Sequence, residues 1–254
     1  MSVSEPIQII PIENVPQVKP GDDVAELIVE ALQHDGERLQ KHDVVVICSK
    51  IIAKAENQIV RLADVTPGEL ATQFATRWGK DARLIEVVLR QTRRIVRMDR
   101  GVLIGETRHG FVCANAGVDR SNVDGGQSVC LLPADPDASA GQLRRVLVER
   151  CGQEVAVIIT DSFGRPWRLG QTDVAVGLAG LEPLADGRGQ RDRHGLELQA
   201  TRIAIADALA AVAGIHFSHR STIAVCIVRN CCYVETDDGR AADLIRQGDE
   251  DLFR

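Results

Sequence analysis

Long apolar runs are missing from this 254-residue sequence, and so is a signal pattern near its start. The longest apolar runs have the length of a strand and fall well short of the roughly 20 residues that a membrane-spanning helix needs. Residues 1–5 do not show the charged and then apolar pattern of a signal peptide. We therefore expect a cytoplasmic protein that does not insert into a membrane.

An excess of basic residues is also missing. The formal net charge is −6 at pH 7, and Lys and Arg are scattered apart from short clusters such as Arg93 and Arg94. Proteins that bind DNA or RNA concentrate positive charge on one surface, so we expect no nucleic-acid partner. With 44% hydrophobic and 26% charged residues, the chain has the composition of an ordinary globular protein of one large domain or two small ones.

The seven cysteines do not form a disulfide or zinc pattern. Their number is odd, and most of them lie inside apolar segments, where a free cysteine packs as a small hydrophobic residue: Cys48, Cys113, Cys130 and Cys226. Cys231 and Cys232 are adjacent rather than spaced as C-x-x-C. We therefore expect no zinc site there and only a local sensitivity to oxidation.

Signatures of the common nucleotide-binding folds are absent as well. The sequence contains neither G-x-x-x-x-G-K-[ST] nor G-x-G-x-x-G, so neither a P-loop nor a Rossmann fold is supported. Short β-branched apolar runs alternate with segments of helical periodicity, which predicts a mixed α/β (α+β) fold. We expect strands at residues 7–12, 43–48, 155–159 and 223–228, and helices that begin near residues 22, 66, 141 and 201.

The segment that begins at residue 66 carries three further predictions. Thr66 lies three residues before Glu69, which is the pattern of a capping box at a helix start. Residues 108–110 are expected to form the tip of a hairpin. The helical pattern continues beyond residues 78–80, so several arginines are expected on a polar helix face. These are Arg93, Arg94, Arg97 and Arg100.

The most informative stretch is residues 155–177, where an apolar strand meets an acid and a hydroxyl. The strand is expected to end at Asp161, and the carboxyl ends of strands in α/β sheets commonly lie at ligand sites. Asp161 and Ser162 offer the oxygen ligands that Mg²⁺ or Mn²⁺ prefers. A turn that leaves the strand explains the same residues equally well, so both interpretations stand.

A second candidate site follows the expected strand at residues 43–48. Ser49, Lys50 and, one turn later, Lys54 can bind a polyphosphate, because lysine supplies positive charge while the hydroxyl and backbone N–H groups orient the oxygens. The solvated start of a helix is the commoner explanation of such a pattern.

A third candidate site lies at residues 114–122. Gly117 and its small neighbours let the backbone approach another group closely, while Asp119 and Asn122 project polar ends. One carboxylate rarely holds a catalytic Mg²⁺ well, whereas two from separate loops together with phosphate oxygens can form an octahedral shell. Asp119 is therefore the expected partner of Asp161.

Six ordered blocks of the sequence are similar to one known family. They are IIPIENVP with KPGDDVAELI, VVICSKIIAKAE, RHGFVCANAGVDRSNV, LLPADPDASA, VIITDSFGRPWRLGQTDVAVG and AADLIRQGDEDLFR. The sequence thus resembles the coenzyme F420-0:L-glutamate ligase (F420 gamma-glutamyl ligase) family, which builds the oligoglutamate tail of a deazaflavin coenzyme. The resemblance implies a family-specific α/β fold over residues 1–254, as one domain or two intertwined subdomains, and a homodimer. It also implies GTP with Mg²⁺ or Mn²⁺ as cofactors, K⁺ being a further candidate.

The resemblance also implies roles for individual residues. Asp119, Asp161 and Lys50 match catalytic positions. Asp119 and Asp161 match the ligands of a shared metal, and Ser162 stands where the family commonly has threonine at a second metal. The positions that match nucleotide contacts are Glu13, Asn14, Val15, Pro16, Ser49, Lys50, Lys54 and Asn122.

One segment departs from the family pattern. Members usually carry a Met-Gly-(Glu or Lys) loop before the last buried strand, whereas residues 216–221 here read HFSHRS. Without the glycines, side chains must make the nucleotide contact, and Arg220 is predicted to bind the triphosphate or the base. A solvated turn explains the segment as well. The departure leaves open the choice between GTP and ATP and the completeness of the second metal's shell.

The expected function is a GTP-dependent amide ligase that adds L-glutamate to F420-0. A carboxylate needs activation before it forms an amide at neutral pH, and a nucleoside triphosphate can supply it through an acyl phosphate. Lys50 and Lys54 would stabilise the transferring group, beside cations held by Asp119, Asp161 and Ser162. The alternatives are a ligase for another carboxylate acceptor and a catalytically silent nucleotide-binding homologue.

Overall fold

The structure of the protein, a computed structural model, describes residues 5–121, 123–217, 222–246 and 251. The fold is mixed α/β, as the sequence predicts. Its helices are α1 (Val24–Asp35), α2 (Ser49–Ala55), α3 (Glu69–Trp78), α4 (Ala82–Gln91), α5 (Pro136–Cys151) and α6 (Ile205–Gly214). Its strands are β1 (Gln8–Ile12), β2 (Val44–Cys48), β3 (Ile59–Arg61), β4 (Thr92–Asp99), β5 (Val102–Thr107), β6 (Val112–Ala114), β7 (Ser128–Cys130), β8 (Ala156–Arg165), β9 (Arg168–Ala179), β10 (Leu184–Asp186), β11 (Arg202–Ala204) and β12 (Val225–Arg229). None of the described helices is both long and apolar enough to cross a membrane.

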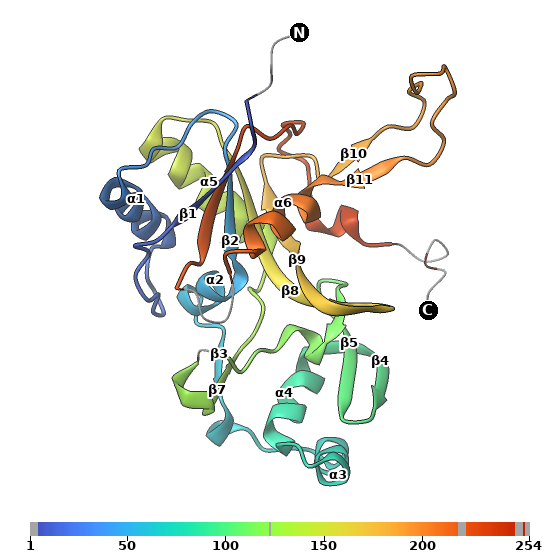
Figure 1. Cartoon of the computed structure of the whole chain (residues 1–254). Coiled ribbons are helices and arrows are strands. Elements are labelled where there is room, and N and C mark those ends of the chain that lie inside the picture. The colour runs from blue at the N-terminus through green and yellow to red at the C-terminus, as the bar shows by residue number, and fades with distance from the viewer. Residues whose placement is uncertain (1–4, 122, 218–221, 247–250, 252–254) are drawn as a thin grey trace.

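A five-stranded sheet in the order β1-β12-β2-β8-β9 forms the centre of the molecule (Figure 1). β2 and β8 are parallel, and the other neighbouring pairs of this sheet are antiparallel. α5 packs on β8 and β9 with α1 beside it, and α6 covers the same strands from the other face. Because both faces are covered, Val44, Ile158 and Ile227 have no exposed surface, and the strands read as continuous apolar runs.

The ends of α1 and α5 follow from local capping chemistry. The Asp23 side chain accepts two backbone N–H hydrogen bonds at the start of α1, and Gly36 ends the helix in the left-handed conformation at φ 69°. The predicted start of α1 is therefore confirmed. α5 begins at Pro136 rather than at the predicted Gly141, because Asp135 caps it and a proline in the first turn needs no N–H partner.

α3, α4 and two of the smaller sheets, those of β3 with β7 and of β4 to β6, lie below the main sheet in Figure 1, whereas β10 and β11 pair at the upper right. β4, β5 and β6 form an antiparallel sheet, and β3 pairs with β7. β6 also contacts β8, so the residues that follow β6 lie against the main sheet. A separate group of buried side chains holds this part together: Leu62, Val65, Val87, Val88, Leu103, Ala116, Val118 and Val129.

Two predictions for the start and length of the helix after residue 66 are wrong. The residue that precedes α3 is Gly68, and no side chain caps the helix, so the pair Thr66 and Glu69 forms no capping box. Gly79 then ends α3 at φ 63°, and Asp81 caps a separate helix, α4. Glycine adopts the left-handed conformation at little cost, so one continuous apolar pattern here belongs to two helices.

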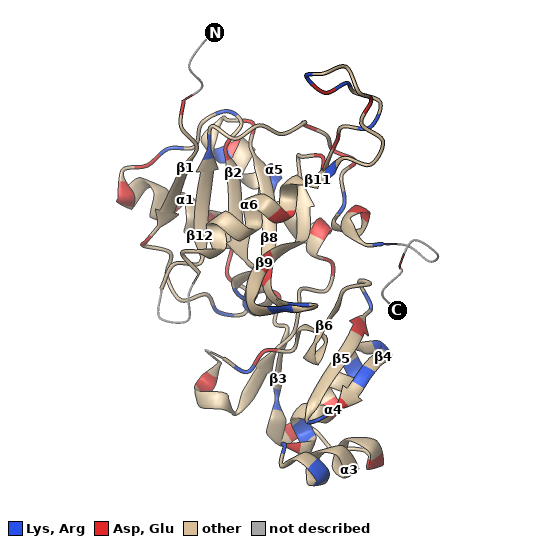
Figure 2. Ribbon diagram, turned by 45° about the vertical axis from the view of Figure 1, so that its right-hand side comes forward, with Lys and Arg blue, Asp and Glu red and all other residues tan. Residues whose placement is uncertain are grey.

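The arginines placed on a helix face lie instead on and beside a strand. Figure 2 shows basic residues along β4, and Arg94 pairs with Glu106 of β5 at 2.8 Å. Two bulges interrupt the pairing of β4 with β5, so the side chains do not alternate regularly in the sequence. The corrected residues are Arg93, Arg94 and Arg97 on β4 and Arg100 in the turn after it.

The hairpin at residues 108–110 is confirmed by the antiparallel pairing of β5 with β6.

The prediction that this strand ends at Asp161 is wrong. β8 runs on to Arg165, and β9 returns from Arg168. A β-bulge between Ile159 and Thr160 marks the point where the β8–β9 hairpin leaves the main sheet as a projecting arm (Figure 1). The arm is held by backbone pairing while its side chains are largely exposed. The apolar pattern therefore stops before the strand does, and Asp161 lies where the sheet becomes the arm.

Candidate active site

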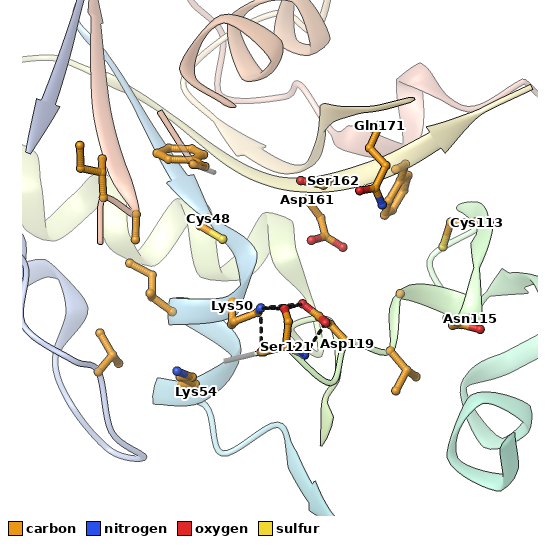
Figure 3. A pocket seen from close by; sticks show the side chains of 18 of the residues that line it. Cys48, Lys50, Lys54, Cys113, Asn115, Asp119, Ser121, Asp161, Ser162 and Gln171 are labelled. Atoms are coloured by element: carbon orange, nitrogen blue, oxygen red, sulfur yellow. Dashed lines mark hydrogen bonds and ion pairs between the residues drawn. The ribbon is translucent and has the colours of Figure 1, made fainter. Parts of the chain in front are cut away.

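A cavity of about 600 Å³ opens where the carboxyl ends of β2 and β8 meet the residues that follow β6 (Figure 3). Its wall also includes residues 15–18, the β8–β9 arm and residues 222–224, which lie far apart in the sequence. The carboxyl edge of an α/β sheet is the usual place for a ligand. The polar side chains in the wall include Lys50, Lys54, Asn115, Asp119, Ser121, Asp161, Ser162, Gln171 and Thr222.

Lys50 and Asp119 form an ion pair in this cavity, with 2.5 Å between Nζ and Oδ2. Ser121 joins them: its hydroxyl and carbonyl accept hydrogen bonds from Lys50 Nζ at 2.8 and 3.0 Å, and its backbone N–H and hydroxyl donate to Asp119 at 2.7 and 2.8 Å. Burial alone would raise the pKa of Asp119, but the hydrogen bonds from Lys50 and Ser121 outweigh it and hold the pKa below its usual value. Asp119 is therefore charged at neutral pH, and it fixes the position of the Lys50 ammonium.

Asp161 points into the same cavity from β8 (Figure 3). Burial and the negative charges of Asp119 and Asp173 raise the pKa of Asp161 to about 7, although hydrogen bonds from the Ser162 N–H and the Ser49 hydroxyl oppose the shift. A cation bound in the cavity would therefore stabilise the charged form of this carboxyl group.

Ser162 donates its hydroxyl hydrogen to Asp173 Oδ1 at 2.5 Å. The two residues are opposite each other in the β8–β9 pairing, and Asp173 exposes 9% of its surface. Burial raises the pKa of Asp173, and the hydrogen bond from Ser162 opposes this shift. Asp173 is not among the residues predicted from the sequence. A lone acid within the apolar pattern of residues 172–179 is the signal that could have found it.

The residues predicted to bind the nucleotide are not all in the cavity wall. The backbone N–H of Glu13 and the side-chain amide of Asn14 both donate to Asp35 at the end of α1. Ser49 is buried and reaches the cavity through its hydrogen bond to Asp161. The predicted residues that do line the cavity are Val15, Pro16, Lys50 and Lys54. Asn122 and Arg220 lie outside the described residues.

Residues 115–117 form a left-handed turn in the cavity wall, with φ values of 53°, 48° and 73°. Residues other than glycine rarely adopt such angles, so tertiary packing must enforce them. A Cβ atom on Gly117 would lie 2.7 Å from Leu132 Cδ1, and Ala116 is buried. The predicted close approach at Gly117 is thus confirmed, with Leu132 as the neighbour. The turn places Asn115 in the cavity wall (Figure 3).

The cavity offers oxygen atoms rather than thiolates to a cation. Asp119 and Asp161 come from separate elements, and Ser162 adds a hydroxyl. Burial raises the pKa of Cys48 and Cys113 to about 12, so both remain thiols, which are poor metal ligands. Within the described ranges no group of three or more His, Cys, Asp or Glu side chains is placed to hold a metal ion. The donors fit a hard divalent cation whose shell is completed by phosphate or water oxygens.

Comparison with known proteins supports the resemblance seen in the sequence. A family model described as "F420-0:Gamma-glutamyl ligase" matches residues 13–230. The coenzyme F420:L-glutamate ligase of Methanothermobacter thermautotrophicus is 44% identical over 98% of this chain and 99% of its own. The proteins of the same name from Methanopyrus kandleri and Methanocaldococcus jannaschii are 42% and 37% identical, each over 98% of this chain and 97% of its own. The chain therefore belongs to the F420-0:gamma-glutamyl ligase family.

Proposed function

We propose that this protein is a ligase that forms an amide between L-glutamate and the carboxylate of F420-0, with GTP as the energy source. Relatives that match nearly the whole chain are named coenzyme F420:L-glutamate ligases, which supports the reaction. The observation that carries the proposal is the placement of the Lys50–Asp119 pair and the Asp161 carboxyl group around one cavity. Positive charge from Lys50 and Lys54 suits phosphate groups, and the two acids suit a cation beside them.

The proposed chemistry proceeds through an acyl phosphate, because a free carboxylate is a poor electrophile. A carboxylate oxygen of F420-0 attacks the γ-phosphorus of GTP, the bond to the β-phosphate oxygen breaks, and GDP leaves. The amine of glutamate then attacks the acyl carbon. Inorganic phosphate leaves with the electron pair of the C–O bond, and the amine nitrogen loses one proton. One GTP is thus converted to GDP and phosphate for each amide formed.

The side chains of the cavity have separate parts in this scheme. Lys50, held by Asp119 and Ser121, presents a fixed positive charge to the transferring phosphoryl group and needs no rearrangement during the reaction. The rings of Phe163 and Phe217 line the cavity and exclude water from the acyl phosphate, which water would otherwise hydrolyse.

The residues that would hold the divalent cations of the family are Asp119, Asp161 and Ser162. A bound Mg²⁺ or Mn²⁺ would neutralise charge on the phosphate oxygens. Two observations support this assignment. The donors are oxygen atoms only, which favours Mg²⁺ and Mn²⁺ over softer metals. Burial and the charges of Asp119 and Asp173 raise the pKa of Asp161, and a bound cation would oppose this shift by stabilising the charged form.

Incubation of the purified protein with F420-0, L-glutamate, GTP and Mn²⁺, followed by mass spectrometry, tests the proposal. The expected product is heavier than F420-0 by one glutamyl residue and forms together with GDP. Oxygen-18 placed in the F420-0 carboxylate should appear in the released phosphate, because the acyl phosphate passes one carboxylate oxygen to phosphorus. Release of GDP without a glutamylated product would exclude F420-0 as the acceptor. Product without label in phosphate would exclude the acyl phosphate.

The unusual sequence of residues 216–221 motivates a comparison within the same assay. HFSHRS replaces the glycine-bearing loop of the family, so ATP is compared with GTP and other carboxylates with F420-0. Equal kcat/KM values for both nucleotides would overturn the GTP assignment. We also propose, from the family resemblance alone, a cytoplasmic homodimer that K⁺ activates. Light scattering measures the oligomeric state, and a K⁺ titration of turnover measures the activation.

A further inference from the structure

Asp173 is an acidic residue beside the cavity to which the proposed function gives no role. It lies on β9 in the arm, exposes 9% of its surface, and is not part of the cavity wall. In the described part of the chain its side chain forms no ion pair, and its hydrogen-bond donor is the neutral hydroxyl of Ser162. A buried carboxylate without a cationic partner lowers stability, so its presence here needs an explanation.

The direction of the hydrogen bond supplies that explanation. In the 2.5 Å contact, Ser162 donates its hydroxyl hydrogen and Asp173 Oδ1 accepts it. A serine hydroxyl has one hydrogen and two lone pairs. Because Asp173 takes the hydrogen, both lone pairs of Ser162 Oγ stay available to the cavity that Ser162 lines. Without Asp173 the hydroxyl can rotate its hydrogen towards the Asp161 carboxyl group and present a hydrogen where a cation needs a lone pair.

We propose that Asp173 is a positioning residue: it holds the Ser162 hydroxyl so that the oxygen lone pairs of Ser162 face a divalent cation in the cavity. Asp173 itself touches neither the cation nor the substrates. The inference rests on the proposed function in one respect, the use of a divalent cation by this cavity. It does not depend on the identity of the acceptor.

The last turn of α6 fixes Asp173 for this role. A Cβ atom at Gly214 would lie 2.6 Å from Asp173 Cγ and 2.7 Å from Asp173 Cβ, so glycine leaves the room that the acid occupies. From the same helix, Asp207 accepts a hydrogen bond from the Ala175 N–H at 2.9 Å and ties α6 to β9 next to Asp173. The acid is therefore enclosed between helix and strand and has little freedom to turn away from Ser162.

A double-mutant cycle on Mn²⁺ binding tests the proposal with the full chain. The variants are Ser162→Ala, Asp173→Leu and the double variant. Free Mn²⁺ is measured by its electron paramagnetic resonance signal, with Mn²⁺ alone and with Mn²⁺ plus GTP, in the absence of F420-0 and glutamate. Each single variant should weaken Mn²⁺ binding by about tenfold or more, the usual effect of losing a group that orients a metal ligand. The Mn²⁺ affinity of the double variant should lie within about twofold of that of the single variant with the lower affinity, because both changes remove the same interaction.

Two further variants test whether Asp173 affects Mn²⁺ binding by orienting Ser162. They examine its negative charge and the change from an acid to leucine as other causes. Asp173→Asn keeps an acceptor oxygen and the side-chain volume, so its Mn²⁺ affinity should stay within about threefold of the wild type. Asp64→Leu makes the same change of residue type at an exposed acid outside the cavity wall and should leave Mn²⁺ affinity unchanged. If Asp173→Leu does not fold, Asp173→Ala takes its place in the cycle.

In the ligation assay, the loss of Asp173 should change the requirement for Mn²⁺ much more than it changes kcat. For Asp173→Leu the Mn²⁺ concentration that gives half-maximal rate should rise about tenfold, while kcat at saturating Mn²⁺ recovers to within about threefold. The proposal would be overturned if the losses of Mn²⁺ affinity in the two single variants multiplied in the double variant. It would also be overturned by an unchanged Mn²⁺ affinity in Asp173→Leu, or by a wild type that does not bind Mn²⁺. Intact Mn²⁺ binding without glutamylation of F420-0 would overturn the proposed function and leave the role of Asp173 standing.

Discussion

Asp161 lowers the stability of the protein without bound ligands, because its partly buried carboxyl group lies near two other acids. Burial and the charges of Asp119 and Asp173 raise its pKa from 3.8 to about 7. A carboxyl group with a higher pKa in the folded state binds more protons there than in the unfolded chain. The free energy of unfolding therefore falls as the pH rises from about 4 to about 7, and the loss is complete above that range.

Asp161→Asn should abolish ligation and stabilise the empty protein. The amide keeps the volume but removes the charge that a cation needs, so kcat/KM should fall at least about 100-fold, or about 3 kcal/mol. The melting temperature should exceed that of the wild type at pH 8 and match it near pH 4, because the wild-type carboxyl group is neutral at the lower pH. Calorimetry at both values measures this. Asp64→Asn, at an exposed acid, is the control. Turnover within about threefold of the wild type would contradict the metal assignment.

Lys50→Met should impair the reaction with GTP through the loss of one positive charge in the cavity. The variant removes the ammonium that Asp119 and Ser121 hold in the cavity, so kcat/KM for GTP should fall about 100-fold or more. Steady-state kinetics with varied GTP measure the effect. Lys41→Met is a matched control, because Lys41 is exposed near the amino end of β2 while Lys50 follows its carboxyl end. Similar losses in both variants would show that the effect is not specific to the cavity.

At the scale of single residues, the sequence predicts the chemistry of the site better than its contacts. Lys50, Asp119 and Asp161 stand out because lysines and acids at strand ends suit phosphates and cations, and the structure brings all three to one cavity. Contacts across strands do not show in the sequence. The bond from Ser162 to Asp173 depends on the register of β8 with β9, which only the folded hairpin sets.

At the scale of secondary structure, elements with local causes were predictable. α1 begins where Asp23 caps it, and β2 is an apolar run that is buried on both faces. The failures have tertiary causes. The end of β8 is held by backbone pairing with β9, which leaves no apolar pattern. The break at Gly79 depends on a left-handed φ of 63°, which periodicity does not detect.

Gly214→Ala should destabilise the protein although it lies in α6. Alanine in place of glycine usually stabilises a helix interior by about 1 kcal/mol, and less at the end of a helix, where Gly214 lies as the last residue of α6. Here the new Cβ would lie 2.6 Å from Asp173 Cγ, so helix or strand must shift. The melting temperature should fall, and Mn²⁺ affinity should fall with it because the bond from Ser162 to Asp173 is disturbed.

Gly141→Ala in α5 is the control for this change of residue type. No atom lies within 4 Å of a Cβ built at Gly141, so the substitution should raise the melting temperature by about 1 to 3 °C. A rise of similar size in Gly214→Ala would show that the contact with Asp173 is not restrictive.

At the scale of the whole molecule, the cavity joins parts of the chain that fold around different cores. Lys50 lies in α2, directly after β2 of the main sheet, and Asp161 lies on β8. Asp119, by contrast, follows a turn whose Ala116 packs in the core of the smaller part. No local pattern places these segments together, because the junction depends on contacts such as those between β6 and β8. A ligand that bridges the cavity should therefore stabilise the protein as a whole rather than one loop.

Thermal unfolding of the full chain with GTP and Mn²⁺ tests this coupling. A ligand at 100 times its Kd stabilises the folded state by about 2.7 kcal/mol, which for a chain of this size raises the melting temperature by about 5 to 10 °C. A chelator should remove most of the shift, because Asp119 and Asp161 repel a triphosphate whose charge no cation neutralises. Asp161→Asn should lose the Mn²⁺-dependent part of the shift. A full shift in the presence of the chelator would mean that GTP binds without the cation, and that the two acids serve another purpose.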